Sequence, residues 1–415
     1  MQASINTNQE FINRQFFNLT LFTLIFGVMF YDTINKLGFS YMDEICAVLL
    51  LVLFGYRVFV SKTWAFNKAF LFVIFVFLFY LIYSIAIGSN AMGAILTDFV
   101  IQFKPYLAFF CAYALRPEFS ENQKKIIRQL IVLCSLYVLA VGLSCFVYYE
   151  VVEYTFGHES RIATASSVLA LLYLYCSDYT KIDKLAFILI LAIGLLSTRS
   201  KHYGFFVICT LLIFYLNGSF KMKFNFKNTF FILVALGLTM LVAWKKIYYY
   251  FVTGGFGSGR SADDLYARMA LYYFSIRIFN DYFPFGSGFA SYATHTSGES
   301  YSSIYAKYNM NNMHGLTKAN PDFIADTYYP ALAQFGYVGV ILFFYFWFNL
   351  LRKAIRTYTK GFVKEAVMAI MIILFFLIEC TSDATITHNR GMFIMMLLGL
   401  IFADIKSRNE NTVSQ

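Results

Sequence analysis

The sequence predicts an all-α polytopic membrane protein with about twelve transmembrane helices and one long periplasmic loop that contains amphipathic helices. Of its 415 residues, 59% are hydrophobic, 20% aromatic and 13% charged, whereas soluble chains carry charge on about 25% of their residues. Apolar runs long enough to cross a hydrocarbon core of about 30 Å recur along nearly the whole chain. Since backbone groups in lipid must be hydrogen-bonded within the protein, and these runs are apolar on every side, we expect helices and exclude a barrel.

Twelve spans are expected, in chain order. They are Phe16 to Tyr31, Ile45 to Val60, Phe66 to Ile87, Ala91 to Leu115, Ile126 to Tyr149, Ile162 to Cys176, Leu185 to Thr198, Tyr203 to Leu216, Thr229 to Ile247, Tyr328 to Leu351, Val363 to Cys380 and Met392 to Asp404. Residues 1–250 therefore form a bundle of nine helices, residues 251–327 the long loop, and residues 328–415 helices ten to twelve with a cytoplasmic tail. In the fourth span Pro105 lies near Asp98 and Gln102, which predicts a helix that is kinked or lines a cavity.

The positions of lysine and arginine set the expected orientation. With both termini in the cytoplasm, the loops rich in these residues also lie there, as the positive-inside rule requires. The long loop and all five histidines then face the periplasm, across a bacterial inner membrane. The net charge of +10 is spread between apolar runs and builds no basic face, which argues against nucleic acid.

A basic corner, Thr198 to His202, lies between two spans on the side where cations are disfavoured. One interpretation is that Arg199, Lys201 and His202 bind an anionic ligand, since an arginine fork matches phosphate oxygens. The alternative is that these side chains reach lipid headgroups without a specific ligand.

An amphipathic helix is expected within the long loop, from about Ala262 to Asn280, after a glycine-rich hinge that begins at Gly254. Its apolar stripe would comprise Leu265, Met269, Tyr272, Ile276 and Phe279, and we expect it to lie on the membrane surface.

Two arginines on this helix are candidate phosphate ligands. Nine positions separate Arg268 from Arg277, so they point to nearly opposite faces and one straight helix does not aim both at one phosphate. Each also has a possible ion-pair partner four positions away, Asp264 for Arg268 and Asp281 for Arg277, so a surface ion pair remains the alternative.

Further along the loop, Gly286 and Gly288 mark a turn that requires glycine backbone freedom. His314 is a candidate general base, with a solvated loop histidine as the alternative. His388 lies in a short turn on the same side and could face the same cavity. The sequence contains no HExxH, CxxC pair or Asp-x-Asp signature, so we expect no metal and no cofactor.

The loop and its flanking helices resemble the O-antigen ligase and polymerase superfamily, and most closely its polysaccharide polymerases. The resemblance rests on Arg268, on Asp281 to Phe289, on Tyr301 to Tyr305, on Asp326 to Gly336 and on the Arg277 to Gly288 spacing; the rest of the chain is similar in helix number, topology and the Thr198-Arg199-Ser200 corner.

The resemblance implies a metal-independent glycosyltransferase that extends an undecaprenyl-diphosphate-linked glycan on the periplasmic face, with Arg199 and Arg268 on the diphosphate. The products would be O-antigen, capsular or exopolysaccharide chains, and a chain-length regulator and a flippase would be partners. The ligases carry a His-Asn pair where Ala325-Asp326 stands here, which argues against a lipid A core ligase and leaves the base unidentified. Asp326 is a candidate, although it could instead cap the helix that begins near Tyr328. A ligase and a flippase of the same lipid-linked glycan remain alternatives.

Overall fold

The computed structural model describes residues 2–39, 41–60, 68–216 and 266–413, together with positions 237, 244 and 248. This part of the chain folds into helices and contains no strand. The elements are α1 (Gln2–Phe22), η1 (Thr23–Met29), α2 (Tyr31–Lys36), α3 (Met42–Val60), α4 (Lys68–Ile87), α5 (Met92–Leu115), α6 (Glu121–Ser144), α7 (Tyr149–Thr155), α8 (Glu159–Tyr175), α9 (Lys181–Ile193), η2 (Gly194–Ser197), α10 (Ser200–Tyr215), α12 (Ala267–Asp281), α13 (His295–Glu299), α14 (Ser303–Lys307), η6 (Met310–Asn312), α15 (Tyr328–Ala331), η7 (Leu332–Phe335), α16 (Gly336–Thr359), α17 (Val363–Glu379), η8 (Thr385–Thr387) and α18 (Asn389–Val413).

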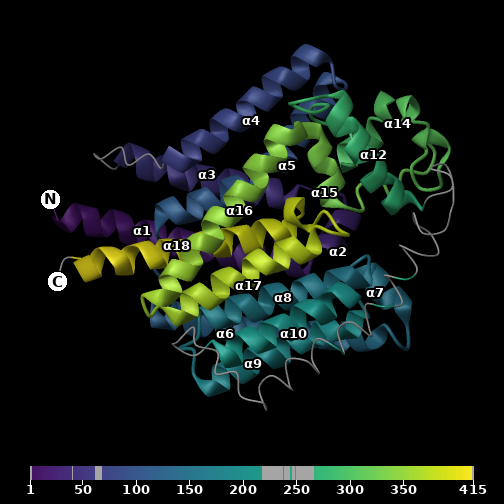
Figure 1. The fold of residues 1–415 in the computed structure, drawn as a ribbon. Coiled ribbons are helices and arrows are strands. Elements are labelled where there is room, and N and C mark those ends of the chain that lie inside the picture. The colour runs from purple at the N-terminus through teal and green to yellow at the C-terminus, as the bar shows by residue number, and fades with distance from the viewer. Residues whose placement is uncertain are drawn as a thin grey trace.

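The long helices form one bundle, and both chain termini lie at the same end of it (Figure 1). We call this end the termini end. The short helices α7, α12 and α14 lie at the opposite end, which we call the loop end (Figure 1). Within the described residues, five helices are long and apolar enough to cross a membrane. The chain is therefore an all-α membrane protein.

Of the twelve expected spans, ten lie wholly within the described residues, and the span from Phe66 to Ile87 lies there from residue 68 onward; each of these eleven coincides with one helix or with two or three consecutive helical elements. The expected span from Thr229 to Ile247 and the glycine-rich hinge at Gly254 lie outside them. Helix α6, at the fifth expected span, ends at Ser144, before the expected Tyr149, because residues 145–148 turn before the separate helix α7.

The centre of the bundle is built on α5 and α18, which pack directly against one another. A Cβ added to Gly399 on α18 would lie 2.3 Å from the carbonyl oxygen of Phe109 on α5. Only glycine allows so close an approach of the two backbones, the usual way in which membrane helices gain contact. Nearly every side chain in the first half of α18 is buried as a result.

The expected turn at Gly286 and Gly288 fixes the long loop to the bundle. The Ser287 and Gly288 amides donate to the carbonyl oxygens of Ala333 (3.3 Å) and Gln334 (2.9 Å). Gly286 has φ +83°, and a Cβ there would lie 2.3 Å from the backbone nitrogen of Gly336. Because Gly286 and Gly336 lack side chains, these two backbone segments, far apart in the sequence, can lie in contact.

Asp98 and Gln102 of α5 have separate tasks. The buried Asp98 carboxylate accepts the Ala290 amide proton at 2.7 Å, which ties the loop to α5. Gln102 lines a cavity beside α5, which confirms the expected cavity. The helix continues through Pro105 without ending.

The expected amphipathic helix is shorter and faces differently. It begins at Ala267, and its buried side chains include Met269, Leu271, Phe274 and Ile278. The expected stripe residue Leu265 and the expected Arg268 partner Asp264 lie outside the described residues. The predicted stripe was wrong in placing Ile276 on the apolar face, because that side chain is 60% exposed. The buried face packs against the residues of the loop itself, including the wholly buried Tyr292, so folding of the loop decided which face is covered.

Candidate functional site

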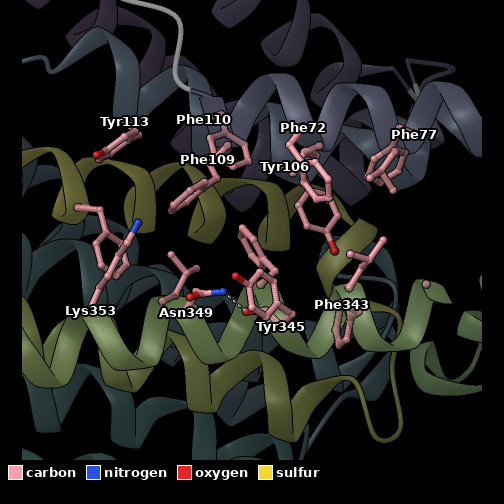
Figure 2. A pocket seen from close by; sticks show the side chains of 18 of the residues that line it. Phe72, Phe77, Tyr106, Phe109, Phe110, Tyr113, Phe343, Tyr345, Asn349 and Lys353 are labelled. Atoms are coloured by element: carbon pink, nitrogen blue, oxygen red, sulfur yellow. Dashed lines mark hydrogen bonds between the residues drawn. The ribbon is translucent and has the colours of Figure 1, made fainter. Parts of the chain in front are cut away.

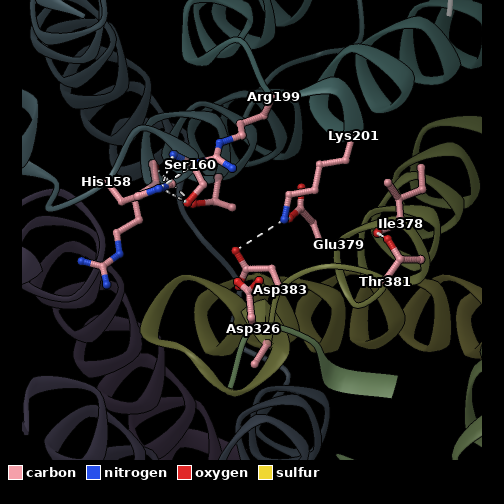
Figure 3. Close-up of polar contacts among 12 residues, drawn as sticks. His158, Ser160, Arg199, Lys201, Asp326, Ile378, Glu379, Thr381 and Asp383 are labelled. Atoms are coloured by element: carbon pink, nitrogen blue, oxygen red, sulfur yellow. Dashed lines mark hydrogen bonds and ion pairs between the residues drawn. The ribbon is translucent and has the colours of Figure 1, made fainter. Parts of the chain in front are cut away.

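A cluster of charged side chains gathers at the loop end from five segments of the chain. Figure 3 shows its members His158, Arg199, Lys201, Asp326, Glu379 and Asp383. We call it the loop-end cluster. Its members precede or begin α8 and α10, lie on α12, precede α15, and end or follow α17; they are His158, Glu159, Arg199, Lys201, Arg268, Asp326, Glu379 and Asp383. Three of its cations were expected to bind phosphate, and each has a carboxylate partner.

Arg199 stands where the chain turns into α10. Thr198 before it has φ +53° and ends η2, so the backbone changes direction and Arg199 becomes the N-cap residue of α10. Its Nη2 donates to Glu159 Oε1 at 2.9 Å and lies 2.7 Å from His158 Nε2. The His158 side chain in turn accepts the Ser160 amide proton and caps α8.

Lys201 points towards the end of α17 (Figure 3). Its Nζ lies 2.6 Å from Glu379 Oε2 and 3.4 Å from Asp383 Oδ2. The Glu379 side chain is 2% exposed, and a buried carboxylate is tolerated when a cation neutralises it. One lysine therefore holds two acids from the α17 end together.

Arg268 forms an ion pair with Asp326, across the long loop. The pKa of Asp326 is raised, because burial disfavours the charged carboxylate more than Arg268 favours it. Asp326 also interacts electrostatically with Asp383 and Lys201, so the Arg268 pair and the Lys201 pair belong to one cluster. The alternative that Asp326 caps a helix is wrong, since Thr327 is the N-cap residue of α15.

Two other groups of the loop-end cluster have shifted pKa values. Burial and the positive charge of Arg199 lower the pKa of His158, so its ring stays neutral to a lower pH than usual. Burial acts to raise the pKa of Asp383, but Lys201 and His388 together outweigh it and leave that pKa lowered. His388 therefore interacts with the cluster, as its position in the sequence suggested.

Several expected site residues lie apart from these pairs. His202 is 1% exposed, and its Nε2 lies 3.0 Å from the Leu191 carbonyl oxygen. The Arg277 guanidinium covers the Tyr273 ring at 4.7 Å, while the expected partner Asp281 accepts a hydrogen bond from Tyr308. We therefore leave His202 and Arg277 out of the proposed site.

His314 is exposed in the loop, with its ring 6.0 Å from that of Phe323, and no contact joins it to the cluster. Gly286 and Gly288 shape the backbone that carries the loop and contribute no side chain. Among the residues that the structure describes, no three His, Cys, Asp or Glu side chains gather in a way that would hold a metal ion.

Sequence analysis missed the acidic half of the cluster: Glu159, Glu379 and Asp383. A signal was present, because Glu379 and Asp383 are acids at the end of an apolar run, where charged residues are costly and mark functional sites. Their partners follow from no local pattern, since 178 positions separate Lys201 from Glu379.

No protein-family model matches the chain, and a comparison with curated proteins finds no significant match. The fold and the site define an all-helical membrane protein with a charge-paired cluster at one end of its bundle.

Proposed function

We propose that this protein is a membrane glycosyltransferase that polymerises undecaprenyl-diphosphate-linked oligosaccharide units into O-antigen, capsular or exopolysaccharide chains. In this proposal the chain crosses the bacterial inner membrane about twelve times, both termini are cytoplasmic, and the loop end faces the periplasm. The observation that supports it is the meeting of Arg199, Lys201 and Arg268 in one cluster beside the long loop. The comparisons with known proteins neither support nor oppose it.

The ion pairs between these cations and nearby carboxylates are compatible with a site that binds an anion. In the proposed complex, phosphate oxygens take the place of the carboxylates of Glu159, Glu379, Asp383 and Asp326 as partners of these cations. A lipid-linked diphosphate carries two negative charges on four non-bridging oxygens, so it can accept hydrogen bonds from more than one of these cations at once and exchange with these carboxylates. The released carboxylates are then available to bind a proton or a sugar hydroxyl.

The chemistry is a displacement at the anomeric carbon. A hydroxyl oxygen of the acceptor unit forms a bond to that carbon, and the bond from carbon to the diphosphate oxygen breaks. The electron pair leaves with the lipid diphosphate, where Arg199, Lys201 and Arg268 stabilise the developing charge. The hydroxyl proton passes to Asp326, whose raised pKa makes it a stronger base than an ordinary aspartate.

One observation favours the flippase alternative. Lys104 of α5 forms ion pairs with Asp43 and Glu44 of α3, and Lys104 and Asp43 are buried. Charged groups inside a helical bundle often mark a transport path. Here they contact one another directly and do not line the cavity beside α5, so we prefer the polymerase.

Arg268→Ala tests the proposal, with Arg277→Ala as a matched control on the same helix. Each variant is expressed in the source bacterium lacking its own copy, and the length distribution of the surface polysaccharide is measured with the protein level. Because removing one donor to a developing anion costs about 100-fold or more in rate, Arg268→Ala and Arg199→Ala should leave only single repeat units. Arg277→Ala should retain long chains.

The same experiment separates the alternatives. Precursor trapped on the cytoplasmic face would indicate a flippase, and long chains that stay on their lipid carrier would indicate a ligase. Unchanged chain lengths in the Arg199→Ala/Arg268→Ala double variant would refute the proposed site.

A further inference from the structure

A second site of different chemistry lies along the side of the bundle. Helices α4, α5, α16 and α18 enclose a groove of about 940 Å³, and its wall is largely apolar with many aromatic rings (Figure 2). Its aromatic lining includes Phe109 and Phe110 of α5, Phe343 and Phe346 of α16, and Phe402 of α18. A wall of this kind accepts hydrocarbon.

Cations gather where the groove reaches the termini end. Lys353 and Arg356 of α16 and Lys406 of α18 all line it there. Lys353 and Lys406 are close enough to repel each other electrostatically, while Glu410, which also lines this end, pairs with Arg116 and offsets only part of the charge around Lys406. Within the part of the chain that the structure describes, neither Lys353 nor Arg356 is placed in an ion pair. An anion between these side chains would relieve their repulsion.

The distance along the groove matches one lipid leaflet. Ten residues separate Phe343 from Lys353 on α16, a rise of about 15 Å, which is half of the roughly 30 Å hydrocarbon core. Figure 2 shows Lys353 and Tyr113 at one end of the groove and Phe77 and Phe343 at the other. Asn349 lies between them, so the lining of the groove changes from polar side chains near Lys353 to aromatic rings near Phe343.

We propose that this half of the groove binds an anionic glycerophospholipid from the leaflet at the termini end. Its phosphate lies against Lys353, Arg356 and Lys406, and its acyl chains follow the aromatic wall towards Phe343. This site is separate from the loop-end cluster and does not depend on the reaction proposed there. Bound lipid would hold α4, which has few buried side chains of its own, against α16.

The test uses the purified full-length protein in detergent, with phosphatidylglycerol and phosphatidylethanolamine added separately and bound lipid counted by native mass spectrometry. The groove variant is Lys353→Gln/Arg356→Gln. Its matched control is Arg352→Gln/Lys125→Gln, which removes the same charge through residues that do not line the groove. A third variant, Asn349→Trp, narrows the groove and leaves every cation in place.

We expect the wild type to bind phosphatidylglycerol in preference to phosphatidylethanolamine. Because each cation near an anionic lipid changes binding about fivefold, the groove variant should bind phosphatidylglycerol about 25-fold more weakly, and the control variant should match the wild type. Asn349→Trp should also lose the lipid. Equal loss in the groove and control variants would reduce the effect to general surface charge and overturn the proposal. So would equal binding of both lipids, or retention of phosphatidylglycerol by Asn349→Trp.

Discussion

Replacing Gly286 by alanine should detach the long loop from the bundle. Gly286 has φ +83°, and an added Cβ would lie 2.3 Å from Gly336 N and 2.4 Å from Ala333 O. Both neighbours are backbone atoms, so no side-chain rotation relieves the contact. The loop segment or the start of α16 must move.

The size of the effect follows from two contributions. A left-handed backbone costs alanine about 1 to 2 kcal/mol. Moving the loop away also breaks the hydrogen bonds from the Ser287 and Gly288 amides, at about 1 kcal/mol each. Together these destabilise the docked loop by about 3 kcal/mol, which corresponds to a factor of about 100 in the docking equilibrium.

The assay is amide hydrogen exchange of residues 284–292, followed by mass spectrometry of the purified protein. Exchange from a locally opened loop reports the docking equilibrium, so this segment should exchange about 100-fold faster in Gly286→Ala. The control is Gly361→Ala. Gly361 has a similar φ of +92° but nothing within 4 Å of an added Cβ, so only the conformational cost applies, at the α16–α17 turn.

Unchanged exchange of residues 284–292 in Gly286→Ala would refute the packing argument. Equal acceleration of that segment in Gly361→Ala would also refute it, because that variant leaves the loop contact intact. A loop that is detached while the bundle stays folded should also abolish polysaccharide chain extension, because Arg268 and Asp326, which both belong to the loop, then move away from Arg199 and Lys201.

Two further predictions concern charge. Asp32 lies between Arg161 and Arg390, and its side chain is 3% exposed. Asp32→Ala should lower the free energy of unfolding by about 3 to 5 kcal/mol, because it leaves a buried arginine without its partner. The thermal unfolding temperature of the purified protein checks this, and a value within a degree of the wild type would contradict it. In the polymerisation reaction, Asp326 acts as a base only when it is ionised, and burial raises its pKa. The rate should therefore fall as the pH drops through the pKa of Asp326, which lies above the usual aspartate value near 4. The Asp326→Asn variant should not show this decrease in rate at low pH. If the rate of the wild-type protein instead stayed unchanged as the pH fell to about 4, Asp326 would be excluded as the base.

Much of the fold follows from the sequence because hydropathy is a local property. A run such as Lys68–Ile87 is apolar on every side, so its helix was expected with bounds close to those observed. The turn at Gly286 was also expected, since a glycine pair after proline is a local signal. What this turn contacts was not, because Gly336 lies 50 positions further along the chain.

The candidate site shows the same division more sharply. Arg199, Lys201 and Arg268 were expected as phosphate ligands from their positions at the ends of apolar segments. Their carboxylate partners were not expected, and the two further candidates, Arg277 and His202, instead contact the Tyr273 ring and the Leu191 carbonyl oxygen. Residue type suggests what a side chain can bind, whereas packing decides what it touches.

By itself, then, the sequence determined that the chain is a helical membrane protein, where most helices begin and end, and which cations stand at their ends. The tertiary structure alone decided that Lys201 meets Glu379, that Arg268 meets Asp326, and that four helices leave a groove between them. The physical reason is range: hydrophobic burial in lipid acts on each segment separately, while an ion pair requires two side chains that only the packed bundle brings within about 4 Å.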